Sequence, residues 1–317
     1  MLERSRTFGW LIKGAITFSF AAAASIASAA TSILFIGNSF TYAQGSPVRF
    51  YRSETIKDLN GGAQGGTPAL FKSFTDQAGL DYDVYMEAQG AVGFDWHLKF
   101  RLDVITKRPW DIVVAQGRAM LDFDRPGDPA LLIETAKQLV DHLKGKNPDV
   151  DVRLEATFAR ADLTYYTPGK WFGKGIEAMT NDVRTGYDQA AKASPTIKGV
   201  IPVGEAWLRA MKVGFADTNP YDGIDAGKVN LWTYDSFHAS TIGYYLKALV
   251  VFGSITGKDP RSLGWNECSG YELGLSQQQI GDLLQIAYDQ LVQSQQLKST
   301  PMPPPPIGSP DRCSGRR

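Results

Sequence analysis

Short apolar runs alternate with amphipathic stretches along most of this sequence, and that alternation is the feature that most limits its possible folds. The apolar runs are rich in Val and Ile, as expected of strands that are covered on both faces of a sheet. Strands separated by helices favour an α/β fold with a parallel sheet. The predicted strands are 32–37, 81–88, 111–116, 150–157 and 198–204.

The stretches between these runs carry apolar residues at helical spacing. Over 67–79, for example, Leu70, Phe71 and Phe74 fall on one face of a helix. Near the end of the chain, Ser276 suits the N-cap of a last helix. The predicted helices are 67–79, 130–146, a long helix after Trp171, 239–256 and the helix that follows Ser276.

The first thirty residues have the three parts of a secretory signal peptide. Arg4, Arg6 and Lys13 form a basic start, an apolar run follows, and 27–30 supply small residues for cleavage. The apolar run is too short and too rich in alanine for a membrane span. We therefore expect a secreted or periplasmic protein with no stable membrane insertion after cleavage. The alternative is an uncleaved N-terminal anchor.

The rest of the chain suits one large domain over 31–298, followed by a proline-rich tail over 299–317. Lys and Arg together number 33, and Asp and Glu together also number 33. A chain so close to neutral gives no electrostatic reason to expect a nucleic-acid partner.

The chain contains two cysteines, Cys268 and Cys313. In an exported protein an even number permits a disulfide, which would tie the tail to the domain, and two free thiols are the alternative. No Cys or His spacing resembles a metal site, and no cofactor is expected.

The first predicted strand runs into Gly37, Asn38 and Ser39, a sequence that permits a sharp turn. In open α/β sheets, functional sites lie just beyond the carboxyl ends of the strands, where Ser39 stands. Backbone N–H groups near such a turn can stabilise an anion that forms at the serine. The alternative is that Ser39 caps the next helix.

A serine nucleophile needs a base, and the chain has three histidines, His97, His142 and His238. His142 falls within a predicted helix. His238 follows Asp235 by three residues, a spacing at which one turn can place the carboxylate beside the imidazole and fix its tautomer. The alternative is that Asp235 and His238 only cap the helix that follows.

Together these two segments resemble the SGNH/GDSL hydrolase superfamily, in a branch whose first block reads G-N-S-F-T, here 37–41. The last block of the family is D-x-x-H, here 235–238. The resemblance covers roughly 32–257. It implies a three-layer, flavodoxin-like α/β/α sandwich with a central parallel sheet. It also implies hydrolysis of esters through an acyl-enzyme, with Ser39 as nucleophile, His238 as base and Asp235 as orienting carboxylate.

The resemblance further implies an oxyanion hole made from three groups: the backbone N–H of Ser39, a glycine N–H after the second strand and an asparagine side chain after the third. Gly90 fits the glycine, with Gly93 as the alternative. The asparagine is absent at the third position, where the chain has Gln116. A glutamine amide is also a donor, so we assign Gln116 this contact. A glutamine bonded to loop backbone is the alternative.

Asn38, His97 and Trp232 are candidates for the substrate-binding surface, although His97 and Trp232 also suit buried packing. The expected substrate is a small-molecule or carbohydrate ester, with an acetyl ester as one candidate. Two alternatives stay open: a non-catalytic carbohydrate-binding protein on the same fold, and an acyltransferase that uses the same three side chains.

Overall fold

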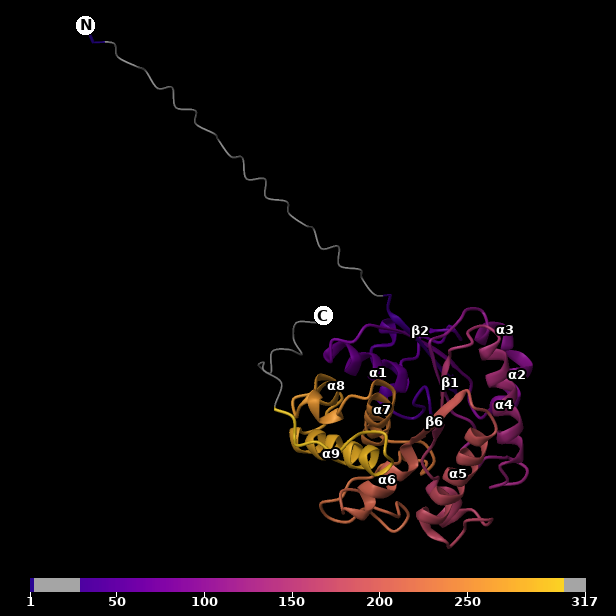
Figure 1. Cartoon of the computed structure of the whole chain (residues 1–317). Coiled ribbons are helices and arrows are strands. Elements are labelled where there is room, and N and C mark those ends of the chain that lie inside the picture. Colours follow the sequence, from indigo (N-terminus) through magenta and orange to yellow (C-terminus); the bar gives the residue numbers. More distant parts are fainter. Residues whose placement is uncertain (3–28, 305–317) are drawn as a thin grey trace.

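The computed structural model describes residues 1–2 and 29–304, and within them six strands form one sheet in which all neighbouring strands are parallel (Figure 1). The order across the sheet is β2-β3-β1-β4-β5-β6. The strands are β1 (Thr31–Gly37), β2 (Lys57–Asp58), β3 (Tyr82–Ala88), β4 (Ile112–Ala115), β5 (Asp151–Ala156) and β6 (Ile197–Pro202).

Helices cover both faces of this sheet, which gives the three layers of an α/β/α sandwich (Figure 1). On one face, α1, α7 and α9 pack together, and on the other face α2, α4 and α5 do so. The helices are α1 (Gly66–Gln77), α2 (Phe94–Phe100), α3 (Leu102–Ile105), α4 (Ala130–Lys144), α5 (Gly175–Lys192), α6 (Val203–Lys212), α7 (Thr241–Thr256), α8 (Cys268–Glu272) and α9 (Gln277–Gln293).

The first strand lies in the middle of the sheet, between β3 and β4. Strands β2 and β3 lie on one side of β1, and the later strands β4, β5 and β6 lie on the other side. The order of the strands therefore reverses direction at β1. In doubly wound sheets ligands bind at the carboxyl ends of the strands at such a switch point. Gly37 pairs with Ala88 of β3, and Ile36 pairs with Ala115 of β4. The loops that follow these three strands therefore start at one edge of the sheet.

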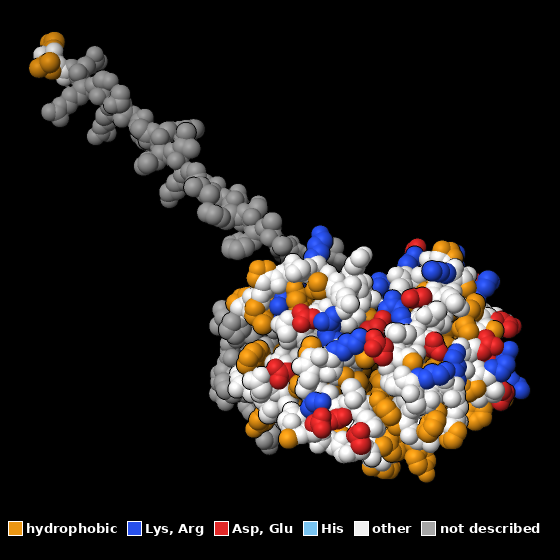
Figure 2. All heavy atoms as spheres, turned by 90° about the horizontal axis from the view of Figure 1, so that it is seen from below, with side chains coloured by type: hydrophobic (Ala, Val, Ile, Leu, Met, Phe, Trp, Pro, Cys, Tyr) orange, Lys and Arg blue, Asp and Glu red, His pale blue; other side chains and the backbone are white. Residues whose placement is uncertain are grey.

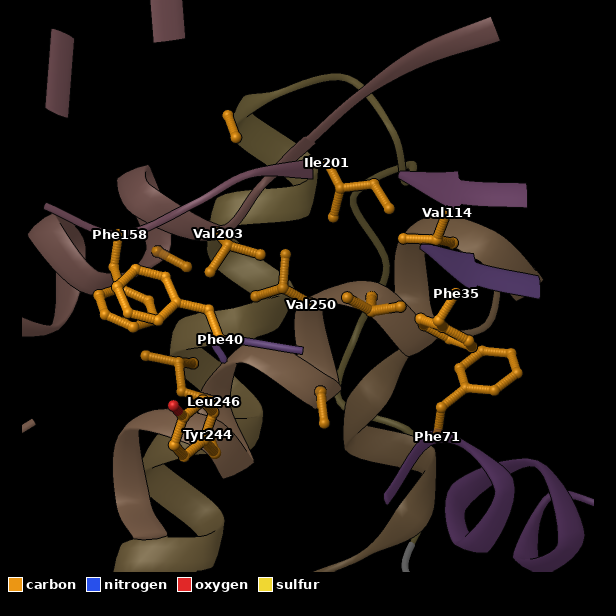
Figure 3. Packing of buried hydrophobic residues seen from close by; sticks show 14 of the residues in the cluster. Phe35, Phe40, Phe71, Val114, Phe158, Ile201, Val203, Tyr244, Leu246 and Val250 are labelled. Carbon is orange, nitrogen blue, oxygen red and sulfur yellow. The ribbon is translucent and has the colours of Figure 1, made fainter. Parts of the chain in front are cut away.

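The core is built from apolar side chains of the sheet and of the helices that cover it, and Figure 3 shows the part around helix α7. The rings of Phe35 and Phe71 meet edge to face, with centroids 5.5 Å apart. Helix α7 is buried over residues 243–254, so it is an interior helix rather than an amphipathic one. Burying each large apolar side chain contributes about 1.5–3 kcal/mol to folding. This burial holds α7 in place and so fixes the end of the loop that precedes it.

The five predicted strands and five predicted helices are confirmed, with ends shifted by a few residues. The sequence analysis missed β2, which is too short to leave an apolar pattern. It also extended the last strand to residue 204, whereas β6 ends at Pro202 and α6 begins at Val203. Pro202 has no N–H to offer a neighbouring strand, and the residues after it form a helix. Among the helices of the described residues, none combines the length and the apolar character that crossing a bilayer requires.

Candidate active site

Ser39 lies in the turn that follows β1, at the carboxyl edge of the sheet. The N–H groups of Thr41 and Tyr42 donate to the carbonyl oxygen of Asn38, at 2.8 Å and 3.3 Å, and so close the turn. A Cβ atom on Gly37 would lie 2.0 Å from Thr41 Oγ1. Close approach of Thr41, rather than an unusual backbone dihedral, is thus the reason for glycine at the strand end.

The structure brings Ser39, His238 and Asp235 together. The Oγ atom of Ser39 lies 3.0 Å from Nε2 of His238, across 199 residues of sequence. The other ring nitrogen, Nδ1, lies 2.6 Å from Oδ2 of Asp235. With Nδ1 protonated and directed at the carboxylate, Nε2 is free to accept the proton of the serine hydroxyl.

The loop that carries Asp235 is shaped by the aspartate itself. Its Oδ1 atom accepts hydrogen bonds from the backbone N–H groups of Phe237, at 2.9 Å, and His238, at 2.8 Å. Burial acts to raise the pKa of Asp235, but the hydrogen bonds from the imidazole and from these two N–H groups outweigh burial and lower it. The carboxylate therefore stays charged beside His238. Between them, Ser236 adopts a left-handed backbone with φ 54°.

Phe40, the residue after Ser39, orients the imidazole ring. Its ring meets His238 edge to face, with centroids 5.5 Å apart, and stacks on Phe158 at 4.5 Å (Figure 3). Phe158 in turn stacks on Trp207 at 4.0 Å. The histidine is thus held against an aromatic column of the core.

Asn38 connects the loops around the serine. Its Nδ2 atom donates to the carbonyl oxygens of Val92, at 3.0 Å, and Gly117, at 3.1 Å, while its Oδ1 accepts from the N–H of Phe40 at 3.1 Å. It also lines the cavity beside Ser39, and its contact with a substrate stays a prediction.

Two backbone N–H groups in the loops that follow β1 and β3 have no acceptor among the described residues. Those of Ser39 and Gly90 donate no hydrogen bond to any residue within 29–304. Gly90 follows β3, and a Cβ atom there would lie 2.8 Å from the hydroxyl oxygen of Tyr42. These are the positions that the sequence analysis assigned to an oxyanion hole.

Gln116 does not occupy the place that we expected. Its side chain is 1% exposed and does not line the cavity. Its Oε1 accepts from the Thr41 hydroxyl at 3.0 Å, and its amide nitrogen donates to the carbonyl of Gly117. The geometry favours the alternative role, a strand-end glutamine that braces the turn from below.

His97 is also displaced from its expected place at the substrate surface, because its side chain is fully buried. Its Nε2 atom lies 2.9 Å from the carbonyl oxygen of Gly37, and its Nδ1 lies 2.5 Å from Glu87 Oε2. The ring thus contacts the end of β1 with one nitrogen and a buried carboxylate of β3 with the other. His97 therefore supports the end of β1 and does not contact a substrate.

The third expectation for the substrate surface, Trp232, is wrong as well. This side chain is 2% exposed, its Nε1 donates to the carbonyl oxygen of Ala159 at 3.0 Å, and its ring packs on Trp207. An indole with its N–H satisfied in the interior belongs to the core.

Three other expectations fall partly or wholly on residues outside the described ranges. Residues 3–28, which make up almost all of the predicted signal peptide, lie outside the described ranges. Most of the proline-rich tail, 305–317, does so too. Cys268 begins α8, whereas Cys313 lies outside the described residues, so the predicted disulfide stays a prediction. The start of the tail is held by Thr300, whose N–H donates to the Tyr288 hydroxyl at 2.6 Å.

A cavity of about 280 Å³ opens beside Ser39. The sequence analysis did not identify most of the residues around it. Two of them, Arg118 and Arg160, follow β4 and β5 by a few residues, and that position at the carboxyl edge was the available signal. The lining consists of Asn38, Ser39, Phe40, Ala91, Arg118, Ala119, Met120, Phe123, Arg160 and Phe237.

Figure 2 shows the described residues from below the view of Figure 1. Charged side chains of both signs are mixed over this face. They do not form a field of one sign, and hydrophobic side chains gather along one rim of that face. Within the described part of the chain, no three His, Cys, Asp or Glu side chains converge in a way that could hold a metal ion.

Comparison with known proteins identifies solved structures that resemble this one. No family model and no curated protein matches this sequence. Solved structures do match. A DUF4886 family protein from Bacteroides uniformis has a TM-score of 0.56 at 15% identity, over 83% of this chain and 95% of that one. A protein described as a GDSL-like lipase, from Parabacteroides merdae, has a TM-score of 0.51 at 18% identity, over 72% of this chain and 95% of that one.

The resemblance noted in the sequence is thereby confirmed for the fold. The chain is an α/β/α sandwich with the fold of the SGNH/GDSL hydrolases. The order of its five longer strands matches the flavodoxin-like arrangement that the resemblance implied.

Proposed function

We propose that this protein is a serine esterase that hydrolyses carboxylic esters through an acyl-enzyme on Ser39. The observation that carries the proposal is the chain of two short contacts from Ser39 Oγ to His238 Nε2 and from His238 Nδ1 to Asp235. A serine hydroxyl in contact with an imidazole, itself oriented by a carboxylate, is the arrangement of an activated nucleophile.

In the first step, Ser39 Oγ attacks the ester carbonyl carbon as its proton passes to His238 Nε2. The carbonyl oxygen becomes an oxyanion, and we assign its binding to the N–H groups of Ser39 and Gly90. The intermediate then breaks the bond to the alcohol oxygen, and His238 gives its proton to the leaving alcohol. Water attacks the acyl-enzyme with His238 as base, which releases the acid and restores the serine.

The N-terminal leader supports export, and we include a secreted or periplasmic location in the proposal. A cavity of about 280 Å³ with several apolar walls suits a short acyl group or a compact alcohol better than a long lipid chain.

The direct test compares wild type with Ser39→Ala in the hydrolysis of 4-nitrophenyl acetate and butyrate. We expect turnover by the wild type and loss of it in the variant, together with labelling of Ser39 by a fluorophosphonate. Equal rates for the two proteins would remove Ser39 as the nucleophile. Labelling at another residue would do the same.

A further inference from the structure

The lining of the cavity beside Ser39 carries positive charge in two places and no carboxylate. Arg118 and Arg160 both line it, and none of the other lining residues is acidic. Their side chains are only 18% and 17% exposed, so both guanidinium groups are largely withdrawn from water. Positive groups held in a partly dry cavity attract an anion more strongly than exposed ones do.

Arg118 is fixed in position from outside the cavity. Asp95 accepts its Nη1 at 2.5 Å and its Nη2 at 3.2 Å. The chain makes room for this pair, because a Cβ atom on Gly93 would lie 2.4 Å from Arg118 Nη1. The Nε atom of Arg118 is buried and has no hydrogen-bond partner among the described residues. A donor is therefore left over after the pair with Asp95 has formed.

Arg160 is fixed in a similar way and lies next to the catalytic loop. Asp162 accepts its Nε at 3.0 Å and its Nη2 at 2.5 Å. The guanidinium carbon lies 3.6 Å from the centroid of the Phe237 ring, and Phe237 precedes His238. Its Nη1 makes no hydrogen bond to any residue of the described ranges. Stacking and the carboxylate together fix the plane of the guanidinium and leave this donor open.

Another arginine–aspartate pair serves as a comparison for the pairs of Arg118 and Arg160. Arg153 binds Asp151 with the same two atoms, Nε at 2.6 Å and Nη2 at 2.9 Å, and with the same two-residue spacing as Arg160 and Asp162. It lies on β5 and does not line the cavity. Arginine–aspartate pairs of this kind recur in the described residues, as Arg261 and Asp259 also show, but neither Arg153 nor Arg261 lines the cavity beside Ser39.

We propose that the ester this site accepts carries a carboxylate or a similar anionic group near the scissile bond, and that Arg118 and Arg160 bind that group. This proposal rests on the proposed esterase function and adds the class of substrate. The planar guanidinium suits a carboxylate in a fixed orientation, and a charged pair formed in a partly dry cavity is strong.

The anionic group can belong to the acid or to the alcohol, and two pairs of substrates distinguish these sources. For the acid, we compare the 4-nitrophenyl monoester of adipic acid with 4-nitrophenyl hexanoate. For the alcohol, we compare 4-acetoxybenzoate with its methyl ester. We expect wild type to have the higher kcat/KM for the charged member of at least one pair, with a preference that declines as salt is added.

Arginine variants then test which residues read the charge. We expect Arg118→Gln and Arg160→Gln to reduce the preference roughly tenfold or more, and Arg118→Lys to keep part of it. Arg153→Gln is the matched control and should leave the preference unchanged. An equal loss of kcat/KM for charged and neutral esters in the Arg118 and Arg160 variants would overturn the proposal. The two arginines would then stabilise the oxyanion or the fold and would not bind an anionic group of the substrate. The absence of any preference in wild type would also overturn it.

A binding experiment separates failure of this proposal from failure of the esterase function. In the Ser39→Ala background, titration calorimetry with adipate does not depend on hydrolysis. Binding that is lost on Arg118→Gln but kept on Arg153→Gln supports the anion site even if no ester is hydrolysed. Adipate binding that is equal in both variants contradicts it, even if neutral esters are good substrates.

Discussion

Lys247 Nζ lies 2.8 Å from the carbonyl oxygen of Phe40, the residue next to Ser39, and 2.8 Å from Glu155 Oε1. Both side chains of this ion pair are essentially fully buried. Burial lowers the pKa of Lys247 and raises that of Glu155, and each partner opposes the effect on the other. The pair joins α7 and β5 directly beneath the turn that carries Ser39.

Breaking this pair should be costly. We expect Lys247→Met to lower the free energy of unfolding by about 3–5 kcal/mol, because it leaves the Glu155 carboxylate buried and unpaired. Denaturant unfolding measures the change. The double variant Lys247→Met/Glu155→Leu should recover most of the loss, since no buried charge is left. Lys57→Met is the control: its partner Asp83 is part-exposed, and the cost should stay below about 1 kcal/mol. A similar loss in the single and double variants would contradict this account.

A second buried carboxylate, Glu87, supports the other side of the same turn through His97. It also accepts from Asn60 Nδ2 at 3.1 Å and from Arg101 Nε at 3.0 Å. Burial acts to raise the pKa of Glu87, but the contacts with His97, Asn60 and Arg101 outweigh burial and lower it. Protonation of Glu87 is therefore harder in the folded protein than in the unfolded chain.

The sign of the pH dependence follows from that lowered pKa. The stability that the Glu87 carboxylate contributes is present above the ordinary glutamate pKa of about 4.3 and is lost as the pH falls through the lower, folded-state value. We expect Glu87→Gln to be less stable than wild type at neutral pH by about 1–3 kcal/mol, and the difference to shrink in acid. Unfolding curves over this pH range measure it. The exposed Glu134→Gln should show a small difference throughout, and a Glu87→Gln deficit that grows in acid would contradict the assignment.

The sequence was informative where a local pattern carries the information. Apolar runs and helical spacing predicted the layers of the fold, and the turn after β1 together with the D-x-x-H spacing predicted that Ser39, His238 and Asp235 converge. The failures concern which way a side chain points. Gln116 directly follows β4, His97 lies in α2 and Trp232 lies in the loop before α7, and spacing alone cannot tell whether such a side chain faces the cavity or the core. Their partners Gly37, Ala159 and Thr41 are distant in sequence and are brought close only by tertiary packing.

Replacement of Asp235 tests the contribution of its negative charge beside His238. Asp235→Asn keeps the size of the side chain but removes the charge beside His238 Nδ1, so the imidazolium formed during attack is no longer stabilised. We expect kcat for an aryl acetate to fall roughly 10²- to 10⁴-fold, with a small change in KM. Fluorophosphonate labelling of Ser39 should slow in parallel. Labelling at the wild-type rate would show that Asp235 does not help to activate the serine.

Gln116 offers a choice between two outcomes. Loss of an oxyanion donor costs about 10²- to 10³-fold in kcat, whereas loss of a buried brace costs about 1–3 kcal/mol of stability. Because its amide bonds to Gly117 and Thr41, we expect Gln116→Ala to lower the free energy of unfolding and to reduce kcat less than 10²-fold. Thr41→Val removes the same contact, so the two changes together should cost less than their sum. A larger loss of kcat with unchanged stability would restore Gln116 to the oxyanion hole.

The N–H of Gly90 can be tested through the one contact that a side chain there would make. The methyl group of Gly90→Ala would lie 2.8 Å from the Tyr42 hydroxyl oxygen, so either the Tyr42 ring or the loop after β3 must shift, and a shift of the loop would carry the N–H away from the carbonyl oxygen it would bind. We expect kcat for an aryl acetate to fall roughly 10²- to 10³-fold. Tyr42→Phe alone should change kcat little, because no described residue bonds to this hydroxyl. The double variant Gly90→Ala/Tyr42→Phe has room for the methyl group, and most of the activity should return. If the double variant is as slow as Gly90→Ala while both proteins remain as stable as wild type, displacement of the loop by this clash is not the cause.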